Sequence, residues 1–222
     1  MKNSLKRETF PTGPLGCNTT FLYDEESKEA LIIDAGQNAT QVYDLITAKN
    51  LKVKYLLHTH AHFDHIGESY KLKMLLGGIP ELYLHEQDQM LYAGLSEQGK
   101  YFGFNLPPAG NIDKWHQDEE TFSFSSPLLQ NFLKTLFTPG HTQGSCCFYT
   151  EIFETPLLFS GDTLFYRSIG RTDLPGGDSN LILKSIKNRL FTLPEETLVI
   201  TGHGPKTTLA LEKKHNPFVG SR

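Results

Sequence analysis

The amino-acid sequence predicts an α/β protein in which two sheets pack together with helices on the outside, a layered sandwich. Three observations lead to this prediction. Short apolar runs of strand length alternate with longer amphipathic stretches, and the alternation occurs in each half of the chain. No Pro- or Ser-rich linker separates the halves. We therefore expect a single domain over residues 1–222, a length that can bury a sizeable core.

The first half begins with a predicted β-hairpin, because two apolar runs flank the polar residues 25–29. In the helix that follows, Val42 and Ile46 fall on one face, and Asn38 is the expected N-cap. A second helix is expected to end at the pair Gly77-Gly78, since glycine commonly terminates helices. The predicted strands of this half are 19–24, 30–34, 53–57 and 81–84, and the predicted helices are 38–50 and 68–76.

The second half repeats the pattern after a less regular stretch. Between residues 86 and 118 several glycines and the pair Pro107-Pro108 interrupt any periodicity, so short helices and loops are expected there. The Gly-rich segment 170–177 is predicted to be a loop. The predicted strands are 120–124, 132–137, 145–150, 157–160 and 198–201, and the predicted helices are 179–191 and 207–215.

The composition excludes several classes of protein. The chain has 21 Lys and Arg residues against 25 Asp and Glu, a net charge of −4, so neither nucleic acid nor an anionic membrane surface is an expected partner. Its 3 cysteines are too few for a disulfide framework and indicate a reducing compartment. The sequence shows no secretory signal and no apolar run near the roughly 20 residues of a membrane span. We therefore predict a cytoplasmic protein; the sequence gives no indication of its oligomeric state.

The segment 57–65 is rich in metal-ligating side chains and runs from a buried strand into a turn and a helix. His60 and His62 are two residues apart where the strand ends, so both rings can point the same way. Asp64 and His65 follow in the turn. Imidazole nitrogens and carboxylate oxygens are ligands that zinc, iron and manganese accept. The segment therefore predicts a metal site.

Three single residues further along the chain complete the predicted site. His141, Asp162 and His203 each follow a predicted strand, and each is preceded by a glycine, which allows close approach of the backbone. Together with the first segment they exceed the four positions of one tetrahedral ion and suit two divalent ions that share one carboxylate. The candidate ligands are His60, His62, Asp64, His65, His141, Asp162 and His203.

Other residues of the same types are interpreted as structural. A single histidine near a strand is more often a hydrogen-bonded structural residue than a ligand. This interpretation applies to His58, His85, His116 and His215. Cys146 and Cys147 lie on a predicted strand beside aromatic residues, so we expect core packing rather than ligation.

At these residues the sequence resembles the metallo-β-lactamase superfamily, from about Asn18 to Phe218. Within it, the sequence is similar to the glyoxalase II (hydroxyacylglutathione hydrolase) branch, and more narrowly to compact bacterial members that lack the C-terminal helical domain. The resemblance implies an αββα four-layer sandwich and hydrolysis of a glutathione thioester such as S-lactoylglutathione. The segments that carry it are T-H-A-H-F-D-H (59–65), P-G-H-T-Q-G-S (139–145), S-G-D-T-L-F (160–165), S-I-G-R-T-D-L-P-G-G-D (168–178) and G-H-G-P (202–205).

The resemblance also implies a role for each ligand. The first metal ion would be held by His60, His62 and His141, the second by Asp64, His65 and His203, and Asp162 would bridge them. Zinc is favoured, with iron or manganese as alternatives.

Arg171 stands at a cationic position of the family and is implied as the partner of a glutathione carboxylate. An arginine in a polar loop is equally often a structural ion-pair partner, and this alternative stays open. The family's tyrosine two places later is Asp173 here. Only 19 residues follow His203 in this sequence, so we expect the glutathione contacts of the helical domain to be missing.

The site chemistry predicts hydrolysis without a serine or cysteine nucleophile. Two cations around one water lower its pKa from 15.7 towards roughly 7 and polarise the substrate carbonyl. Asp64 is expected to orient the hydroxide as well as bind metal, and Asp162, the bridging ligand, is the second residue assigned to catalysis. A thiolate leaves readily, so no strong general acid is required.

Other functions stay open from the sequence. A glutathione persulfide dioxygenase of the same superfamily uses one iron held by two histidines and one aspartate, and the stretch Gly170 to Asp173 also occurs in that family. A non-catalytic metal-binding protein is the second alternative. A β-lactamase would be expected to carry a periplasmic signal, and a superfamily ribonuclease a nucleic-acid-binding insertion, neither of which the sequence shows.

Overall fold

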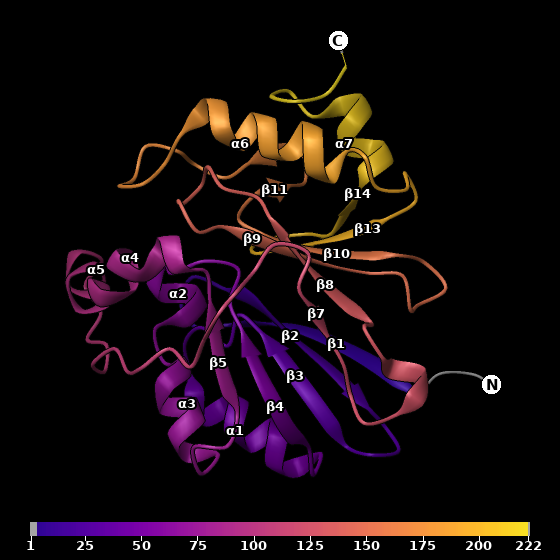
Figure 1. Cartoon of the computed structure of the whole chain (residues 1–222). Helices are drawn as coiled ribbons and strands as arrows, with labels where there is room; N and C mark the ends of the chain where they lie inside the picture. The colour runs from indigo at the N-terminus through magenta and orange to yellow at the C-terminus, as the bar shows by residue number, and fades with distance from the viewer. Residues whose placement is uncertain (1–3, 222) are drawn as a thin grey trace. The chain divides into compact units, whose positions relative to one another are not determined.

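Two six-stranded sheets organise residues 4–221, which are the residues that the computed structural model describes. Each sheet belongs to one of two units (Figure 1). The first unit comprises Met1–His116 and Ser123–Gln130, and the second comprises Gln117–Phe122 and Asn131–Arg222. The expectation of a single domain over 1–222 stays a prediction. No helix in the described part of the chain is long and apolar enough to cross a membrane.

The first unit contains a mixed sheet with the strand order β1-β2-β3-β4-β5-β6. Its first three strands pair antiparallel, whereas β3 to β6 pair parallel. The predicted hairpin is confirmed as β2 and β3, in which Phe21 pairs with Ile32. The strands are β1 (Leu5–Thr12), β2 (Cys17–Asp24), β3 (Glu29–Ile33), β4 (Lys52–Leu57), β5 (Glu81–Leu84) and β6 (Lys114–Trp115).

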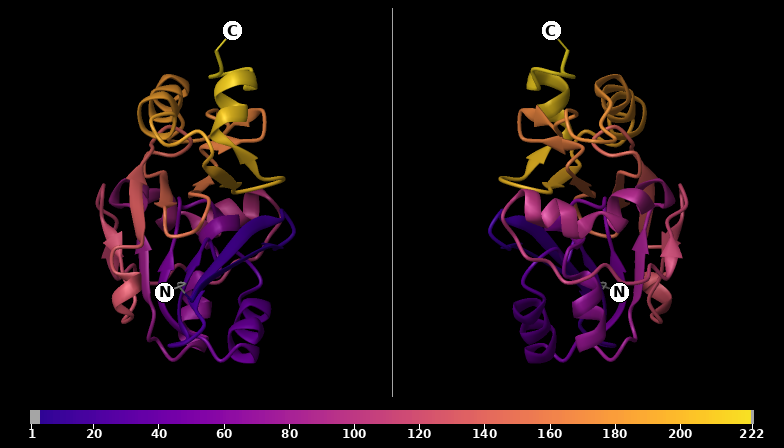
Figure 2. Two further views of the ribbon diagram at one scale, coloured as in Figure 1. Left: turned by 90° about the vertical axis from the view of Figure 1, so that its right-hand side faces the viewer. Right: turned by 90° about the vertical axis from the view of Figure 1, so that its left-hand side faces the viewer.

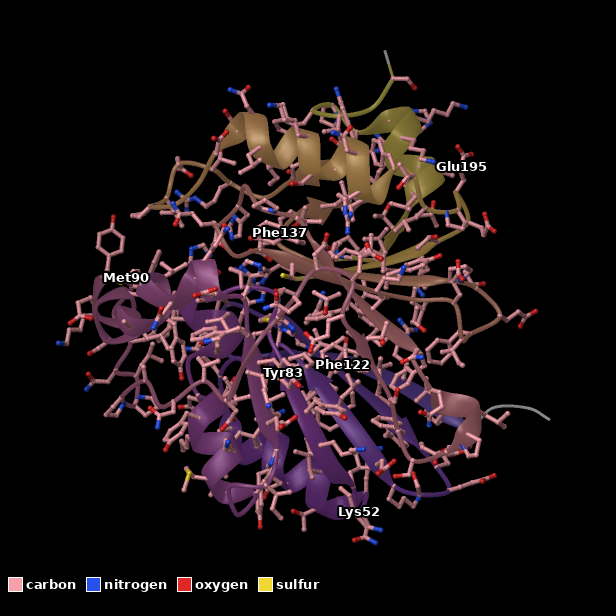
Figure 3. All side chains as sticks on the ribbon, in the orientation of Figure 1. Lys52, Tyr83, Met90, Phe122, Phe137 and Glu195 are labelled. Atoms are coloured by element: carbon pink, nitrogen blue, oxygen red, sulfur yellow. The ribbon has the colours of Figure 1, made fainter. Side chains whose placement is uncertain are left out.

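Helices α1 and α3 cover one face of this sheet (Figure 1). Val42 and Ile46 of α1 and Leu72 of α3 pack against Ile32 and Leu82 of the sheet in one apolar cluster. The region predicted as short helices and loops contains α4 and α5, and Met90 of α4, labelled in Figure 3, is 83% exposed. The helices and 3-10 turns are α1 (Ala39–Ala48), α2 (Phe63–Ile66), α3 (Ser69–Leu75), η1 (Glu86–Asp88), α4 (Gln89–Ala93), α5 (Leu95–Tyr101) and η2 (Pro127–Leu129).

The start of α1 differs from the prediction. Asn38 occupies the N-cap position with φ 63°, but within residues 4–221 its side chain makes no capping hydrogen bond. Instead, the Ala39 N–H donates to Glu68 Oε2 at 2.8 Å. The cap therefore comes from a residue 29 positions away in sequence, which local helix signals do not reveal.

The second unit contains a sheet with the order β14-β13-β10-β9-β8-β7. Strands β10 and β13 pair parallel, and β9 lies antiparallel between β8 and β10. Consequently β8, β10 and β13 all end at the same edge of the sheet. The strands are β7 (Thr121–Phe122), β8 (Leu133–Phe137), β9 (Cys146–Thr150), β10 (Leu157–Gly161), β13 (Leu198–Thr201) and β14 (Thr207–Thr208), with a separate hairpin of β11 (Leu164–Phe165) and β12 (Ser168–Ile169).

Helices α6 and α7 lie on the same side of this second sheet (Figure 2). The predicted helix 179–191 is present, but it divides into α6 (Ser179–Ser185) and the π-helical η3 (Ile186–Leu190). In η3 the Phe191 N–H donates to the Ile186 carbonyl at 2.9 Å, five residues back. Buried Ile182, Ile186 and Leu190 face the sheet at a spacing of four. The last helix is α7 (Leu209–His215).

Candidate metal centre

The histidine-rich segment lies where the sequence predicts it, between the end of a strand and the start of a helix. β4 ends at Leu57, His62 is the N-cap residue of α2, and Asp64 and His65 belong to that helix. His60 and His65 are buried, and their ring centroids are 4.1 Å apart. The first unit therefore gathers the four predicted ligands of this segment at one sheet edge.

The possible ligand atoms of this segment are spaced so that two of them could bind the same ion. His60 Nε2 lies 3.0 Å from His62 Nδ1, and His65 Nε2 lies 3.7 Å from Asp64 Oδ2. Two ligand atoms of one tetrahedral zinc ion, each bound at about 2.0–2.1 Å, are about 3.4 Å apart. Each pair thus fits one ion in distance and in donor chemistry.

Asp34 fixes the orientation of two of these histidine rings. Its Oδ2 accepts hydrogen bonds from His65 Nδ1 at 2.9 Å and from the Thr59 hydroxyl at 2.8 Å, and its Oδ1 accepts the Thr59 N–H at 2.8 Å. The Thr59 oxygen in turn accepts from His60 Nδ1 at 3.0 Å. Hydrogen bonds of this kind set which ring nitrogen faces a metal.

Asp34 is not among the site residues predicted from the sequence, although a signal was present. It directly follows β3, and its N–H donates to the Leu57 carbonyl at the end of the parallel neighbour β4. A polar residue at the end of a strand beside the strand that carries the metal motif is therefore a candidate partner. Asp34 also has a φ of 53°, a conformation that is uncommon outside glycine and that asparagine and aspartate adopt more often than other residues.

The backbone of the metal segment is held by two residues from the region predicted as short helices and loops. Asp88 Oδ2 accepts the Ala61 N–H at 2.9 Å. Gln98 Oε1 accepts the Phe63 N–H at 3.2 Å, while its Nε2 donates to the Ala61 carbonyl at 3.2 Å. The short helices η1 and α5 therefore position the metal segment. The weak periodicity of residues 86–118 does not indicate this role.

Cys17 forms a buried cluster with Asp34 and His65, whose possible ligand atoms lie within 4.8 Å of one another. Its Sγ is 3.5 Å from His65 Nδ1. Burial raises the pKa of the Cys17 thiol to about 12, so the group is a neutral thiol at pH 7. Because His65 Nδ1 already donates to Asp34, we interpret the cluster as a hydrogen-bonded support for His65.

His58 is a buried structural residue, as predicted from the sequence. Its Nδ1 donates to the carbonyl of Tyr83, labelled in Figure 3, at 2.9 Å, and its Nε2 accepts from the Ser69 hydroxyl at 2.7 Å. Burial lowers the pKa of His58 to about 4, so the ring is neutral at pH 7. His116 is also buried, and its ring lies 5.3 Å from that of Tyr83.

The second unit presents the other three predicted ligands at one sheet edge. His141 follows β8, which ends at Phe137 (Figure 3), while Asp162 directly follows β10 and His203 follows β13. Asp162 Oδ2 lies 3.6 Å from His141 Nε2, and Asp162 Oδ1 lies 3.8 Å from His203 Nε2. The two oxygens of one carboxylate therefore face two different histidines.

Main-chain contacts hold these ligands. His141 Nδ1 donates to the Arg171 carbonyl at 2.8 Å. At Gly170 a Cβ would lie 1.8 Å from the Asp162 carbonyl oxygen and 3.1 Å from His141 Cγ, so only glycine fits. Gly140 has a φ of 136°, and a Cβ there would lie 2.2 Å from the Ile182 nitrogen. The glycine before His141 is thus required by packing on α6.

Arg171 forms an ion pair within its own loop. Its Nε donates to Asp173 Oδ1 and its Nη2 to Asp173 Oδ2, both at 2.7 Å. Both side chains are more than half exposed. Of the two sequence-based interpretations, the ion pair is present, and the role of Arg171 toward a substrate stays a prediction.

The predicted core position of the two adjacent cysteines is confirmed. Cys146 and Cys147 lie on β9 and are 1% and 0% exposed. Cys147 belongs to the apolar cluster beneath α6 and η3.

Comparisons with known proteins agree with this arrangement. A family model described as "Metallo-beta-lactamase superfamily" matches residues 12–203. Hydroxyacylglutathione hydrolase GloC from Haemophilus influenzae is 36% identical over 217 residues, which are 97% of this chain and 98% of that protein. These matches confirm the resemblance that the sequence motifs indicate.

Two solved structures are similar over nearly the whole chain. The crystal structure of BLEG-1 B3 metallo-beta-lactamase has a TM-score of 0.85 and 36% identity, covering 97% of this chain and 100% of that one. The crystal structure of TTHA1623 in a di-iron-bound form has a TM-score of 0.84 and 34% identity, covering 95% of this chain and 99% of that one. The predicted fold class, an α/β fold of the metallo-β-lactamase type, is confirmed.

Proposed function

The chain belongs to the metallo-β-lactamase superfamily, and we propose that it is a binuclear metal-dependent hydrolase of S-acylglutathione thioesters such as S-lactoylglutathione. The likeness to a relative named hydroxyacylglutathione hydrolase supports this substrate class. The donor chemistry and ligand spacing within each unit support the metal dependence.

The observation that carries the proposal is the geometry of Asp162. Its two oxygens face His141 and His203 separately, at 3.6 and 3.8 Å, as expected of a carboxylate that bridges two ions. We assign His60, His62 and His141 to the first ion and Asp64, His65 and His203 to the second.

The chain's own residues would prepare this centre for hydrolysis. The Nδ1 atoms of His60, His65 and His141 each donate a hydrogen bond, to Thr59, Asp34 and the Arg171 carbonyl. These hydrogen bonds leave Nε2 of each ring as the atom that would bind metal. Asp64 would orient the attacking water as well as bind metal.

Divalent ions in these positions would supply a water of lowered pKa and would polarise the thioester carbonyl. The leaving thiolate is stable in water, so the chain needs no strong general acid.

We propose zinc or iron as the resident metal. Imidazole and carboxylate ligands accept both, and the similar TTHA1623 structure is described as di-iron-bound. We also propose a reducing, cytoplasmic location, which the buried thiols of Cys17, Cys146 and Cys147 support.

The test compares three reactions of the same purified protein. We expect hydrolysis of S-lactoylglutathione, measured by thiol release, without oxygen uptake on glutathione persulfide and without cleavage of a chromogenic β-lactam. Oxygen uptake with one iron per chain would instead indicate a persulfide dioxygenase. Cleavage of the β-lactam at a higher kcat/KM than the thioester would indicate a β-lactamase. No turnover of any of the three would favour a non-catalytic metal-binding protein.

A further inference from the structure

Arg171 and Asp173 form a charge-neutral pair in the loop beside a proposed metal ligand. The pairing is bidentate, with two hydrogen bonds of 2.7 Å, the geometry in which guanidinium and carboxylate match best. The Arg171 hydrogen bonds lower the pKa of Asp173 to about 2, so both partners are charged at neutral pH. The positive charge of Arg171 is therefore balanced locally.

Contacts other than the ion pair also hold the loop in place. Gly170 fits closely against the Asp162 carbonyl, and the Gly177 N–H donates to the Leu174 carbonyl at 2.9 Å. Asp178 then caps α6 through the N–H groups of Asn180 and Leu181. The side chains of Arg171 and Asp173 are 56% and 67% exposed, and exposed ion pairs contribute little to folding.

The position of the pair is nevertheless tied to the metal centre. The Arg171 carbonyl accepts the hydrogen bond of His141 Nδ1 at 2.8 Å, which places this residue next to a proposed ligand. A substrate group that approaches Arg171 would meet the Asp173 carboxylate at the same time. A second carboxylate would be attracted by one partner and repelled by the other, whereas an uncharged amide would only gain hydrogen bonds.

We infer that Asp173 is a specificity-determining residue, which cancels the charge of Arg171 so that the chain recognises the amide groups of an acyl thioester and not its terminal carboxylate. The inference rests on the proposed function. It predicts a broader substrate class than S-acylglutathione alone, namely acyl thioesters of amide-containing thiols with or without a carboxylate.

The test uses two thioesters that differ by one charge: S-lactoylglutathione and the same compound with its glycine carboxylate converted to a primary amide. For the protein without substitution, the two kcat/KM values should agree within about twofold. In Asp173→Asn the guanidinium loses its internal partner, so the carboxylate form should become preferred by about 5- to 10-fold, mainly through a lower KM.

Two further variants act as controls. Arg171→Gln combined with Asp173→Asn should abolish the new preference. Glu119→Gln removes a carboxylate that pairs with Arg189 at 2.7 Å in the same unit, and it should leave the ratio unchanged.

A preference of more than tenfold for the carboxylate form before any substitution would overturn the inference, as would an unchanged ratio in Asp173→Asn. Loss of metal from Asp173→Asn would also overturn it, because the pair would then be a support for His141.

If neither thioester is hydrolysed, the proposed function fails. The inference is then judged by calorimetric affinities for S-methylglutathione and its glycine amide, which must be equal without substitution and differ in Asp173→Asn. Absence of binding by both compounds would contradict it.

Discussion

Asp34 accepts a hydrogen bond from His65 Nδ1 at 2.9 Å, and the same carboxylate oxygen accepts the hydroxyl of Thr59, which holds His60. One buried carboxylate thus fixes two rings that we assign to two different metal ions. Outer contacts of this kind commonly contribute 10- to 100-fold to metal affinity.

The substitution Asp34→Asn should therefore weaken metal binding by about 10- to 100-fold, because the amide donates where the carboxylate accepted. Competition against a chromophoric chelator measures the affinity. Asp24→Asn is the matched control, since Asp24 is another buried carboxylate of the first unit that holds a turn through Ser27. It should leave the metal affinity unchanged. Equal affinities for Asp34→Asn and the unsubstituted protein would refute the role of Asp34.

Asp162 and Asp64 should differ in what their removal does to metal content. A bridging carboxylate touches both ions, whereas Asp64 touches one in our assignment. We expect Asp162→Ala to lose most of both ions and nearly all turnover, and Asp64→Ala to retain about one ion per chain. Elemental analysis after gel filtration gives the stoichiometry. Two ions retained by Asp162→Ala would show that this residue does not bridge.

The substitution Gly170→Ala tests how closely the backbone packs against Asp162 and His141. The added Cβ would lie 1.8 Å from the Asp162 carbonyl oxygen, so the backbone must move, and His141 with it. We expect lower metal content together with a lower Tm. Gly94→Ala is the control, because its Cβ would meet nothing closer than 3.5 Å. An unchanged metal content in Gly170→Ala would contradict the packing argument.

Asp24 should contribute to the loss of unfolding free energy at acid pH. Burial opposes its ionisation, but the hydrogen bonds from the side chains of Ser27 and Ser4 and from the backbone N–H groups of Ser27 and Glu26 together outweigh burial and lower the pKa of Asp24. A lowered folded-state pKa means that the contribution is present above the unfolded value of about 3.9 and is lost as the pH falls below it.

Asp24→Asn should therefore lose on the order of 1 kcal/mol at pH 7 and show a shallower decline between pH 5 and pH 3. Urea unfolding at several pH values measures this. Parallel curves for both proteins would show that Asp24 titrates normally.

Most strands of the fold follow from the sequence, because buried runs such as Leu157–Gly161 are short, apolar and bounded by turn residues. β1 (Leu5–Thr12) escaped prediction because it contains Lys6, Arg7 and Glu8, which are tolerated where a strand pairs on one side with β2. The two-residue strands β6 and β14 are too short to carry a pattern. The π-helical turn after Ser185 could not be predicted, because it differs from an α-helix in its backbone hydrogen bonds and not in the spacing of its apolar residues.

The proposed ligands could be selected from the sequence, because they combine residue types that bind metal with positions close behind predicted strands. The residues that support them could not be selected in this way. Asp88 and Gln98 hold the backbone at Ala61 from 27 and 37 residues away, and Glu68 caps α1 from 29 residues away. Contacts between residues so far apart in sequence form only in the folded chain, so local periodicity does not indicate them. Asp173 was visible as a departure from the family, but its ion pair with Arg171 required coordinates.

The most direct test of the proposed function is the rate of S-lactoylglutathione hydrolysis as zinc or iron is added stepwise to metal-free protein. A binuclear hydrolase predicts that the rate rises to a plateau at two equivalents of metal per chain. A plateau at one equivalent, or no hydrolysis at any metal loading, would contradict the account.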